Sequence, residues 1–468
     1  MNRNLALLLS LLITLLCGCT LAPEYTRPES PVPPDWPTGP AYSDIQAAPG
    51  APTVPQLKWR EFFTDGRLQE VIETALLHNR DLRLVALNVE KVRALYDIQR
   101  AELFPSVNVA GSGSKQRVPA DLSSSGKSMT AEQYGVNLGI TSWEIDFFGR
   151  IRSLRDQALQ EYLATEQARR SAQISLVSAV AQAYLTLAAD RGNLKLARDT
   201  LESQRAAYAL IQRRYDVGLA TELDLRRAQT QFDAARGDLA RFTQMTAQGL
   251  NALNLLAGSP VPEELLPIDL GSVAHSRDIS PGLTSEVLLN RPDIMAAEHR
   301  LKGASASIGA ARAAFLPRLS LTTTVGTASA ELSGLFGDGS ATWSFVPQIA
   351  VPIFDARTWA ALRVTKAEQQ IILAQYEKAI QTAFREVADV LAVHGTIDQQ
   401  VSAQQSLVNA VAETYLLSDM RYTKGIDSYL SVLDAQRSLY SSRQGLISLN
   451  LAKRVSQVRL YTVLGGGA

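Results

Sequence analysis

The sequence predicts a mixed α and β membrane protein, in which each chain contributes four strands to a β-barrel shared between chains and also forms a long α-helical coiled coil. Three observations predict this fold class. The chain of 468 residues begins with a secretory signal, and its two halves repeat one another. Each half holds two strand-length segments with alternating polarity, followed by a very long proline-free helical stretch.

The N-terminus predicts export and lipid attachment. Arg3 precedes the apolar run Leu5–Leu16, which is long enough for a signal peptide but too short to span a bilayer. The signal peptide is expected at residues 1–18, because Leu16-Cys17-Gly18-Cys19 resembles a bacterial lipobox. Cys19 would then carry a diacylglycerol and an N-acyl chain, which together anchor stably. Thr20, where an aspartate would favour inner-membrane retention, indicates the outer membrane; a plain cleaved signal is the alternative.

The segment 19–65 is predicted to be a lipidated, extended arm. Residues 20–56 contain ten of the twenty prolines, and proline neither donates a backbone hydrogen bond nor continues a helix. The first repeat is assigned to 66–258, a connector to 259–285 and the second repeat to 286–468. The repeats align Arg214–Leu219 with Arg421–Ile426, 207 positions later.

The strand segments alternate apolar residues with polar or small ones. Tyr134, Val136, Leu138 and Ile140 share one predicted face, and four such segments occur, of the length that outer membrane strands have. The segments Lys115–Thr130 and Glu331–Ser340 are expected as exposed loops. Four strands cannot close a barrel, and an open sheet edge is not tolerated in lipid, so several chains must share one barrel. A dimer would be too narrow for an aqueous pore, whereas a trimer supplies twelve strands.

Two long helices carry heptad repeats. The first series is Val180, Leu187, Leu194, Leu201, Tyr208 and Tyr215, and the second is Val387, His394, Val401, Val408, Tyr415 and Tyr422. A seven-residue period sustained over five heptads indicates packing of helix on helix. No proline interrupts 150–216 or 357–423, so each helix could reach on the order of 100 Å. Gly218 and Gly425 are predicted to end these helices and let the chain turn back.

Composition excludes several functions. The 46 basic and 46 acidic residues cancel, which argues against nucleic-acid binding. Both cysteines lie in the signal region and the four histidines are far apart, so neither a metal site nor a cofactor is expected apart from the lipid on Cys19. Gly126-Lys127-Ser128 lacks the first glycine of a phosphate loop, because Asp121 occupies that position. We therefore expect no enzyme.

Six segments distributed along the mature chain are distinctive together: Trp59–Phe63, Asn79–Leu82, Trp143–Arg150, Arg291–Ile294, Ile308–Pro317 and Leu433–Ser438. With these segments the sequence resembles the TolC family of outer membrane channels, specifically the OprM-like lipoproteins of resistance-nodulation-division efflux systems. The resemblance covers essentially the whole mature chain.

This resemblance implies a homotrimer with a twelve-stranded barrel in the outer membrane, a twelve-helix periplasmic tunnel and a mixed equatorial belt around the tunnel. The implied function is passive conduction of drugs and other small toxic compounds. The implied partners are a periplasmic adaptor (a membrane fusion protein), an inner-membrane resistance-nodulation-division proton/drug antiporter, and outer membrane lipid.

The same resemblance assigns the two helical turns to the periplasmic end. The turns implied to dock the adaptor comprise Val217, Gly218, Leu219, Ala220 and Thr221 in the first repeat and Gly425, Ile426, Asp427 and Ser428 in the second. Leu430 and Asp434, four apart on one helix face, match the family's constriction. Arg421, Tyr422 and Tyr215 are expected to hold this gate closed through hydrogen bonds.

Two other interpretations remain open at this point. One is a TolC-like channel for proteins or metal ions, and the other is a non-channel scaffold lipoprotein of the periplasm. The sequence does not identify the exported compounds, nor the pump and adaptor that the chain serves.

Overall fold

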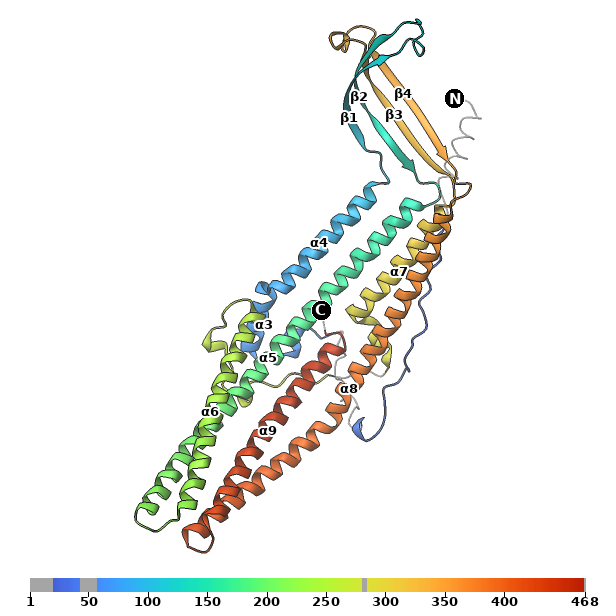
Figure 1. The fold of residues 1–468 in the computed structure, drawn as a ribbon. Coiled ribbons are helices and arrows are strands. Elements are labelled where there is room, and N and C mark those ends of the chain that lie inside the picture. Colours follow the sequence, from blue (N-terminus) through green and yellow to red (C-terminus); the bar gives the residue numbers. More distant parts are fainter. Residues whose placement is uncertain (1–19, 43–56, 280–283, 467–468) are drawn as a thin grey trace. The chain divides into compact units, whose positions relative to one another are not determined.

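The computed structural model describes residues 20–42, 57–279 and 284–466 (Figure 1). Residues 1–18 of the predicted signal peptide and the predicted lipid site Cys19 lie outside these ranges. The described chain separates into two compact units. The first holds the arm up to Glu29 together with Asn88–Glu166 and Ala296–Tyr376, and the second holds Ser30–Leu87, Gln167–Met295 and Glu377–Ala468. Each unit therefore combines corresponding pieces of both repeats.

The first unit contains one antiparallel sheet in the order β1-β2-β3-β4. Its strands are β1 (Val107–Val118), β2 (Met129–Ile145), β3 (Arg318–Ser329) and β4 (Ala341–Ala350). The four predicted strands are thus present, two from each repeat, and the repeats meet where β2 pairs with β3. The predicted loop at Lys115–Thr130 was too long. Alternation continues beyond Lys115, whose ammonium group pairs with Glu132 across the two strands at 2.5 Å.

The register gathers the apolar side chains on one face of the sheet. Val109 lies opposite Leu138, Leu138 opposite Val325, and Val325 opposite Trp343, so one apolar row crosses all four strands. An irregularity between Ile140 and Trp143 adds one residue to β2 and keeps both side chains on this face. The alternation predicted from the sequence is therefore the alternation of the folded sheet.

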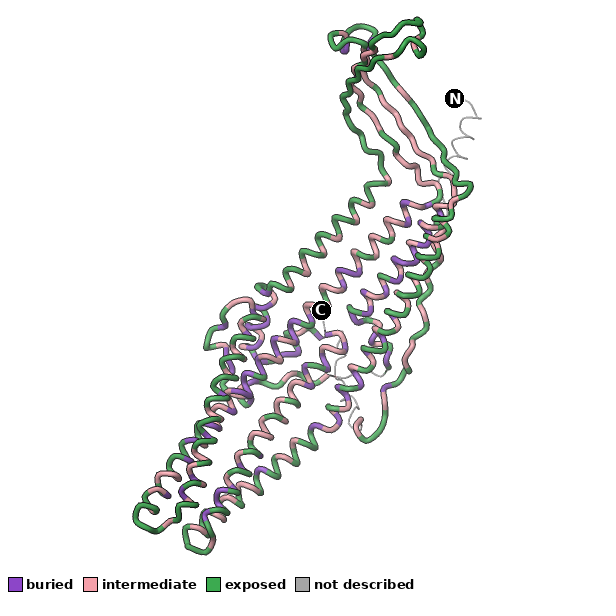
Figure 2. Tube along the Cα trace, in the orientation of Figure 1, coloured by how far each residue is buried: buried purple, intermediate pink, exposed green. Residues whose placement is uncertain are grey.

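The helices of the first repeat are α3 (Gly66–His78), α4 (Arg80–Ala101), α5 (Arg150–Asp216) and α6 (Glu222–Ala257). Those of the second are α7 (Pro292–Ala313), α8 (Ala356–Thr423) and α9 (Tyr429–Val463). Helices α5 and α8 have 67 and 68 residues, as the absence of proline predicted. The predicted heptad positions Val180, Leu187 and Val387 are fully buried, whereas Tyr215 near the end of α5 is exposed. Figure 2 shows buried residues recurring along α5 and exposed residues at the turns that follow α5 and α8.

The described part of the predicted extended arm contains a short α-helical turn, α2 (Trp59–Phe62). Aromatic packing explains it. The ring of Phe62 stacks on that of Tyr461 in α9 with centroids 4.3 Å apart, and the Tyr461 hydroxyl donates to the Leu57 carbonyl at 3.1 Å. The described residues also form short 3-10 turns. These are η1 (Pro40–Tyr42) in the arm, η3 (Glu263–Leu265) and η4 (Leu270–Ser272) in the connector, η5 (Ser285–Asn290) at the start of the second repeat, and η6 (Leu332–Gly334) between β3 and β4.

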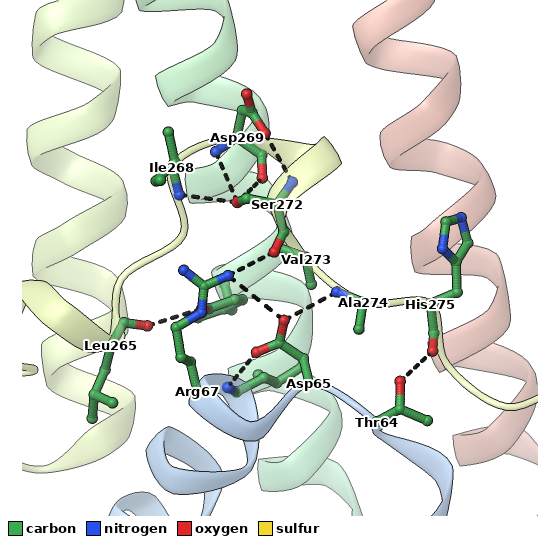
Figure 3. A network of polar contacts seen from close by, with 12 residues as sticks. Thr64, Asp65, Arg67, Leu265, Ile268, Asp269, Ser272, Val273, Ala274 and His275 are labelled. Carbon is green, nitrogen blue, oxygen red and sulfur yellow. Dashed lines mark hydrogen bonds and ion pairs between the residues drawn. The ribbon is translucent and has the colours of Figure 1, made fainter.

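A polar network ties the connector to α3 in the second unit (Figure 3). The Asp65 carboxylate accepts the Leu68 N–H at the start of α3 and the Ala274 N–H of the connector, both at 3.0 Å. Arg67 donates to the Ser272 carbonyl at 2.6 Å. Because Asp65 is buried, these bonds fix the connector firmly against the helices.

The beginning of the arm is held in the first unit. Arg27 pairs with the buried carboxylate of Glu298 on α7 at 2.9 Å, and Lys302 pairs with the same group at 2.9 Å. Burial alone would raise the pKa of Glu298, but the bonds from Lys302 and Arg27 outweigh it and hold this pKa below its usual value. The arm is therefore bound to α7 directly after the predicted lipid site.

Candidate gate and helical tips

Both long helices end in the same backbone motif. At the end of α5 the Gly218 N–H donates to the Tyr215 carbonyl at 2.9 Å, and the Leu219 N–H reaches back to the Arg214 carbonyl at 2.7 Å. Gly425 and Ile426 repeat this pattern at the end of α8, with both bonds at 2.9 Å. The two glycines have φ of 75° and 72°, in the left-handed region that glycine adopts at lowest cost. Their predicted role as turn formers is confirmed.

The helices that return from the turns start differently. Thr221 caps α6, because its hydroxyl accepts the Asp224 N–H while the Asp224 carboxylate accepts the Thr221 N–H. Ser428 occupies the equivalent position before α9 but makes no side-chain cap bond. The second repeat has Ser431 where the first has Asp224, so the reciprocal carboxylate is missing.

The tips present apolar side chains on their surface. Val217 and Leu219 of the first turn are 69% and 70% exposed, and Ile426 of the second is 59% exposed. Ala220 is half-buried against an apolar core that joins two helical hairpins, α5–α6 and α8–α9. Exposed branched apolar groups at a helix end are unfavourable in water, which is typical of a surface that another protein covers.

Arg421 and Asp427 form an ion pair inside the second turn. The Arg421 guanidinium donates to both carboxylate oxygens of Asp427, at 2.6 and 3.2 Å. This bond raises the pKa of Arg421 and holds that of Asp427 below its usual value. Arg421 is one of the residues expected to hold the gate closed through hydrogen bonds. Within the described chain its side-chain bonds go to Asp427 in its own turn, and its role in the gate stays a prediction.

Tyr422 does connect the two hairpins, through a partner that the sequence did not identify. Arg214 of α5 donates to the Tyr422 hydroxyl of α8 at 2.7 Å, and its guanidinium lies 5.5 Å from the centre of the same ring. The Tyr215 hydroxyl makes no hydrogen bond within the described part of this chain. Arg214 is the repeat equivalent of Arg421, so the alignment of the repeats was the signal that could have identified it.

Around this bond, an apolar cluster joins the two hairpins. Its buried members are Ile211, Leu225, Ala228, Tyr429, Val432 and Leu433. The ring of Tyr429 lies 5.0 Å from that of Tyr422, while its buried hydroxyl has no partner among the described residues. Burial, reinforced by Tyr422 and Tyr415, raises the pKa of Tyr429 to about 12. The cluster makes the two hairpins pack tightly near their tips.

The predicted constriction residues lie next to this cluster, on the first turns of α9. Leu430 is 38% exposed, and the exposed carboxylate of Asp434 pairs with Arg437 three residues later. Neither side chain is used by the packing between the hairpins. Both are therefore free to face a surface outside this chain, and their closing of a pore stays a prediction.

A chain of amides extends the contact between the hairpins away from the tips, and sequence reasoning missed it. Gln204 of α5 donates to Gln436 of α9 at 3.0 Å, and Gln436 donates to the Tyr415 hydroxyl at 3.1 Å. Glutamine carries no distinctive pattern in a polar helix. Only the fold brings these three side chains together.

Comparison with known proteins places this architecture in a family. The family model described as "Outer membrane efflux protein" matches residues 71–259 and 283–466. The antibiotic efflux pump outer membrane protein ArpC of Pseudomonas putida is 48% identical over 466 residues, which are 98% of this chain and 95% of that protein.

Solved structures agree over the whole fold. A membrane protein from Pseudomonas aeruginosa matches with a TM-score of 0.90 and 43% identity, covering 96% of this chain and 98% of that one. The open state of the Neisseria gonorrhoeae MtrE outer membrane channel matches with a TM-score of 0.86 and 36% identity, with the same coverage. These matches confirm the predicted resemblance, fold class, outer membrane location and role in efflux. The chain belongs to the family of outer membrane efflux proteins.

Proposed function

We propose that three copies of this chain form one continuous duct that passively conducts small toxic organic compounds out of the cell. The observation that carries this proposal is the sheet, because the outer edges of β1 and β4 pair with no strand in the described part of the chain. Unpaired strand edges are not tolerated in lipid, and pairing β4 of one copy with β1 of the next satisfies them. Three copies give twelve strands, a barrel wide enough for an aqueous pore.

The exported class follows from the relatives. ArpC is named as part of an antibiotic efflux pump, and nearly half of its residues are shared along the whole chain. This favours small organic compounds over proteins or metal ions as the cargo. The family consists of efflux channels, and a channel of this kind needs no catalytic residue in the chain.

The helical turns are the docking surface in this proposal. A periplasmic adaptor would cover the exposed side chains of Val217, Leu219 and Ile426, with the polar groups of Thr221, Asp427 and Ser428 beside them. An inner-membrane resistance-nodulation-division antiporter would supply the energy. Docking would let the α8–α9 hairpin move outward. This hairpin is assigned the movement because the start of α9, unlike that of α6, has no side-chain cap bond.

In the closed duct, at the end formed by the helical turns, three copies of Leu430 would meet at the threefold axis and three copies of Asp434 would surround them. The leucines block ions by contact and dewetting, while the carboxylates attract cations and repel one another. Recording single channels of the purified protein in planar bilayers tests the duct itself. A protein that inserts but never conducts, even with Leu430 and Asp434 both replaced by alanine, would contradict the proposal.

Lipid attachment to Cys19 completes the proposal. Arg27, eight residues after Cys19, pairs with Glu298 of α7 and holds the arm on that helix. The acyl chains would therefore enter the membrane close to a fixed point of the protein. Cys19→Ser should abolish metabolic labelling with palmitate and leave insertion intact, because the barrel also holds the protein in the membrane. Label that persists on the Cys19→Ser protein rules out this site.

A further inference from the structure

The second unit contains a cavity whose lining includes none of the gate or docking residues named above. It has a volume of about 460 Å³ and lies between α5, α9 and the connector segment Asp269–His275. The same connector segment is held in place by the network around Asp65 (Figure 3). This volume is within the range of sites that bind small molecules, and its walls come from regular helices and a fixed segment.

The lining carries an excess of positive charge. Lys195 of α5 and Lys453 and Arg454 of α9 face the cavity, together with one carboxylate, that of Asp269. The Asp269 carboxylate is already engaged, because it accepts the Ser272 N–H at 2.9 Å. Lys453 has an acidic partner in Asp398, whereas Lys195 forms no ion pair with any residue that the structure describes.

Arg454 is the most informative of these cations. It is half-buried and donates to the Val273 carbonyl at 2.7 Å, but it forms no ion pair with a carboxylate of the described chain. Burial lowers the pKa of Arg454, and the more distant charge of Asp65 opposes this only in part. A partly desolvated guanidinium that no carboxylate of the described chain contacts favours an anion beside it.

The remaining walls suit an apolar body. Ala188, Leu270 and Ile447 contribute apolar surface. Gly192, in the interior of α5, lines the same space. A Cβ atom there would meet only the side chains of Asp269 and Ile447, at 3.9 and 4.0 Å. Glycine inside a helix costs about 1 kcal/mol relative to alanine, and at this position it leaves the cavity open.

We propose that this cavity binds a small organic anion that carries one carboxylate on an apolar ring or short chain. The carboxylate lies against Lys195 and Arg454, and the apolar part lies against Ile447 and Leu270. Occupancy links α5, α9 and the connector, so the ligand stabilises this part of the fold. The proposal does not depend on conduction, because all the residues that line the cavity come from one chain.

Calorimetric titration of the full-length protein in a non-ionic detergent tests the proposal. The probes are 2-naphthoate, its neutral isostere 2-naphthamide and the cation 2-naphthylmethylammonium, each at low and high salt. We expect 2-naphthoate to bind, the other two to bind at least several-fold more weakly, and the affinity for 2-naphthoate to fall as salt rises. Equal binding of 2-naphthamide, or no binding of 2-naphthoate, would overturn the assignment of an anion site.

Variants locate the site. Lys195→Gln should weaken 2-naphthoate about fivefold, the upper range for an exposed ion pair, and Lys195→Arg should restore it. Gly192→Leu fills the cavity and should abolish binding, while its thermal unfolding reports whether the fold is intact. Lys378→Gln on α8 is the matched control, because Lys378 is an exposed lysine that does not line the cavity. Binding that survives both Lys195→Gln and Gly192→Leu unchanged lies elsewhere and contradicts the proposal.

Discussion

Tyr422→Phe separates the hydrogen bond between the hairpins from the packing around it. Phenylalanine keeps the ring that lies 5.0 Å from Tyr429 and 5.5 Å from the Arg214 guanidinium, and it removes only the hydroxyl that accepts from Arg214 at 2.7 Å. If the α8–α9 hairpin moves away from the α5–α6 hairpin on opening, this bond exists only in the closed state. Tyr422→Phe then destabilises the closed state and leaves the open state unaffected.

The magnitude follows from the environment of the bond. A hydrogen bond to a charged group is worth about 1.5–3 kcal/mol when buried, but Arg214 and Tyr422 are both half-exposed, so about 1 kcal/mol per chain is appropriate. Three chains that open together lose about 3 kcal/mol, which corresponds to an increase in the open-to-closed ratio on the order of a hundredfold. Chains that open independently would each gain only about fivefold.

Single-channel recording in planar bilayers measures this ratio directly. Tyr215→Phe is the matched control, because Tyr215 is the repeat equivalent of Tyr422 and its hydroxyl has no partner within the described part of the chain. We expect Tyr215→Phe to behave like the parent and Tyr422→Phe to open far more often, with unchanged oligomeric state. If Tyr422→Phe conducts like the parent, the hairpins do not separate at this bond and the reasoning is wrong.

Three further predictions concern the gate and the stability of the fold. Leu430→Ala combined with Asp434→Ala should raise single-channel conductance and remove block by multivalent cations from the tip side; unchanged block places the constriction elsewhere. Tyr429→Phe removes a buried hydroxyl without a partner, so thermal unfolding should show a gain of about 1 kcal/mol, and a loss would reveal a partner in another chain. Burial lowers the pKa of His299 on α7, so the unfolded chain binds a proton at this histidine more readily than the folded chain does. The free energy of unfolding should therefore fall as pH drops below about 6.5. Measured by thermal unfolding between pH 7 and 5, His299→Gln should flatten this dependence.

Much of the fold could be predicted because its signals are local and periodic. The long helices follow from a sustained heptad without proline, and the strands follow from alternation that also matches the register across the sheet. The turns follow from glycines that the left-handed backbone requires. Each of these signals depends on residues close together in sequence, which is why sequence reasoning detects them.

The partners of the gate residues could not be predicted, because they depend on which helix faces which. Arg214 and Arg421 are equivalent in sequence, but one bonds to the other hairpin and the other bonds within its own turn. The difference comes from Asp427, whose equivalent in the first repeat is Ala220. A single nearby carboxylate redirects one arginine, and no periodicity reports that choice. The cavity beside Lys195 likewise exists only once α5, α9 and the connector are assembled.

The pairing of β2 with β3 has a consequence for the ancestry of the chain. It joins the β1–β2 pair of the first repeat to the β3–β4 pair of the second. Within one chain it is therefore the counterpart of the contact that β4 and β1 of neighbouring copies make in the proposed trimer. A ring of six identical single-repeat chains could have formed the same wall with one kind of contact throughout. A single-repeat ring of that kind would present six identical tips. Because Ala220 and Asp427 occupy equivalent positions and differ, a ring of three two-repeat chains presents two chemically distinct kinds of tip in alternation.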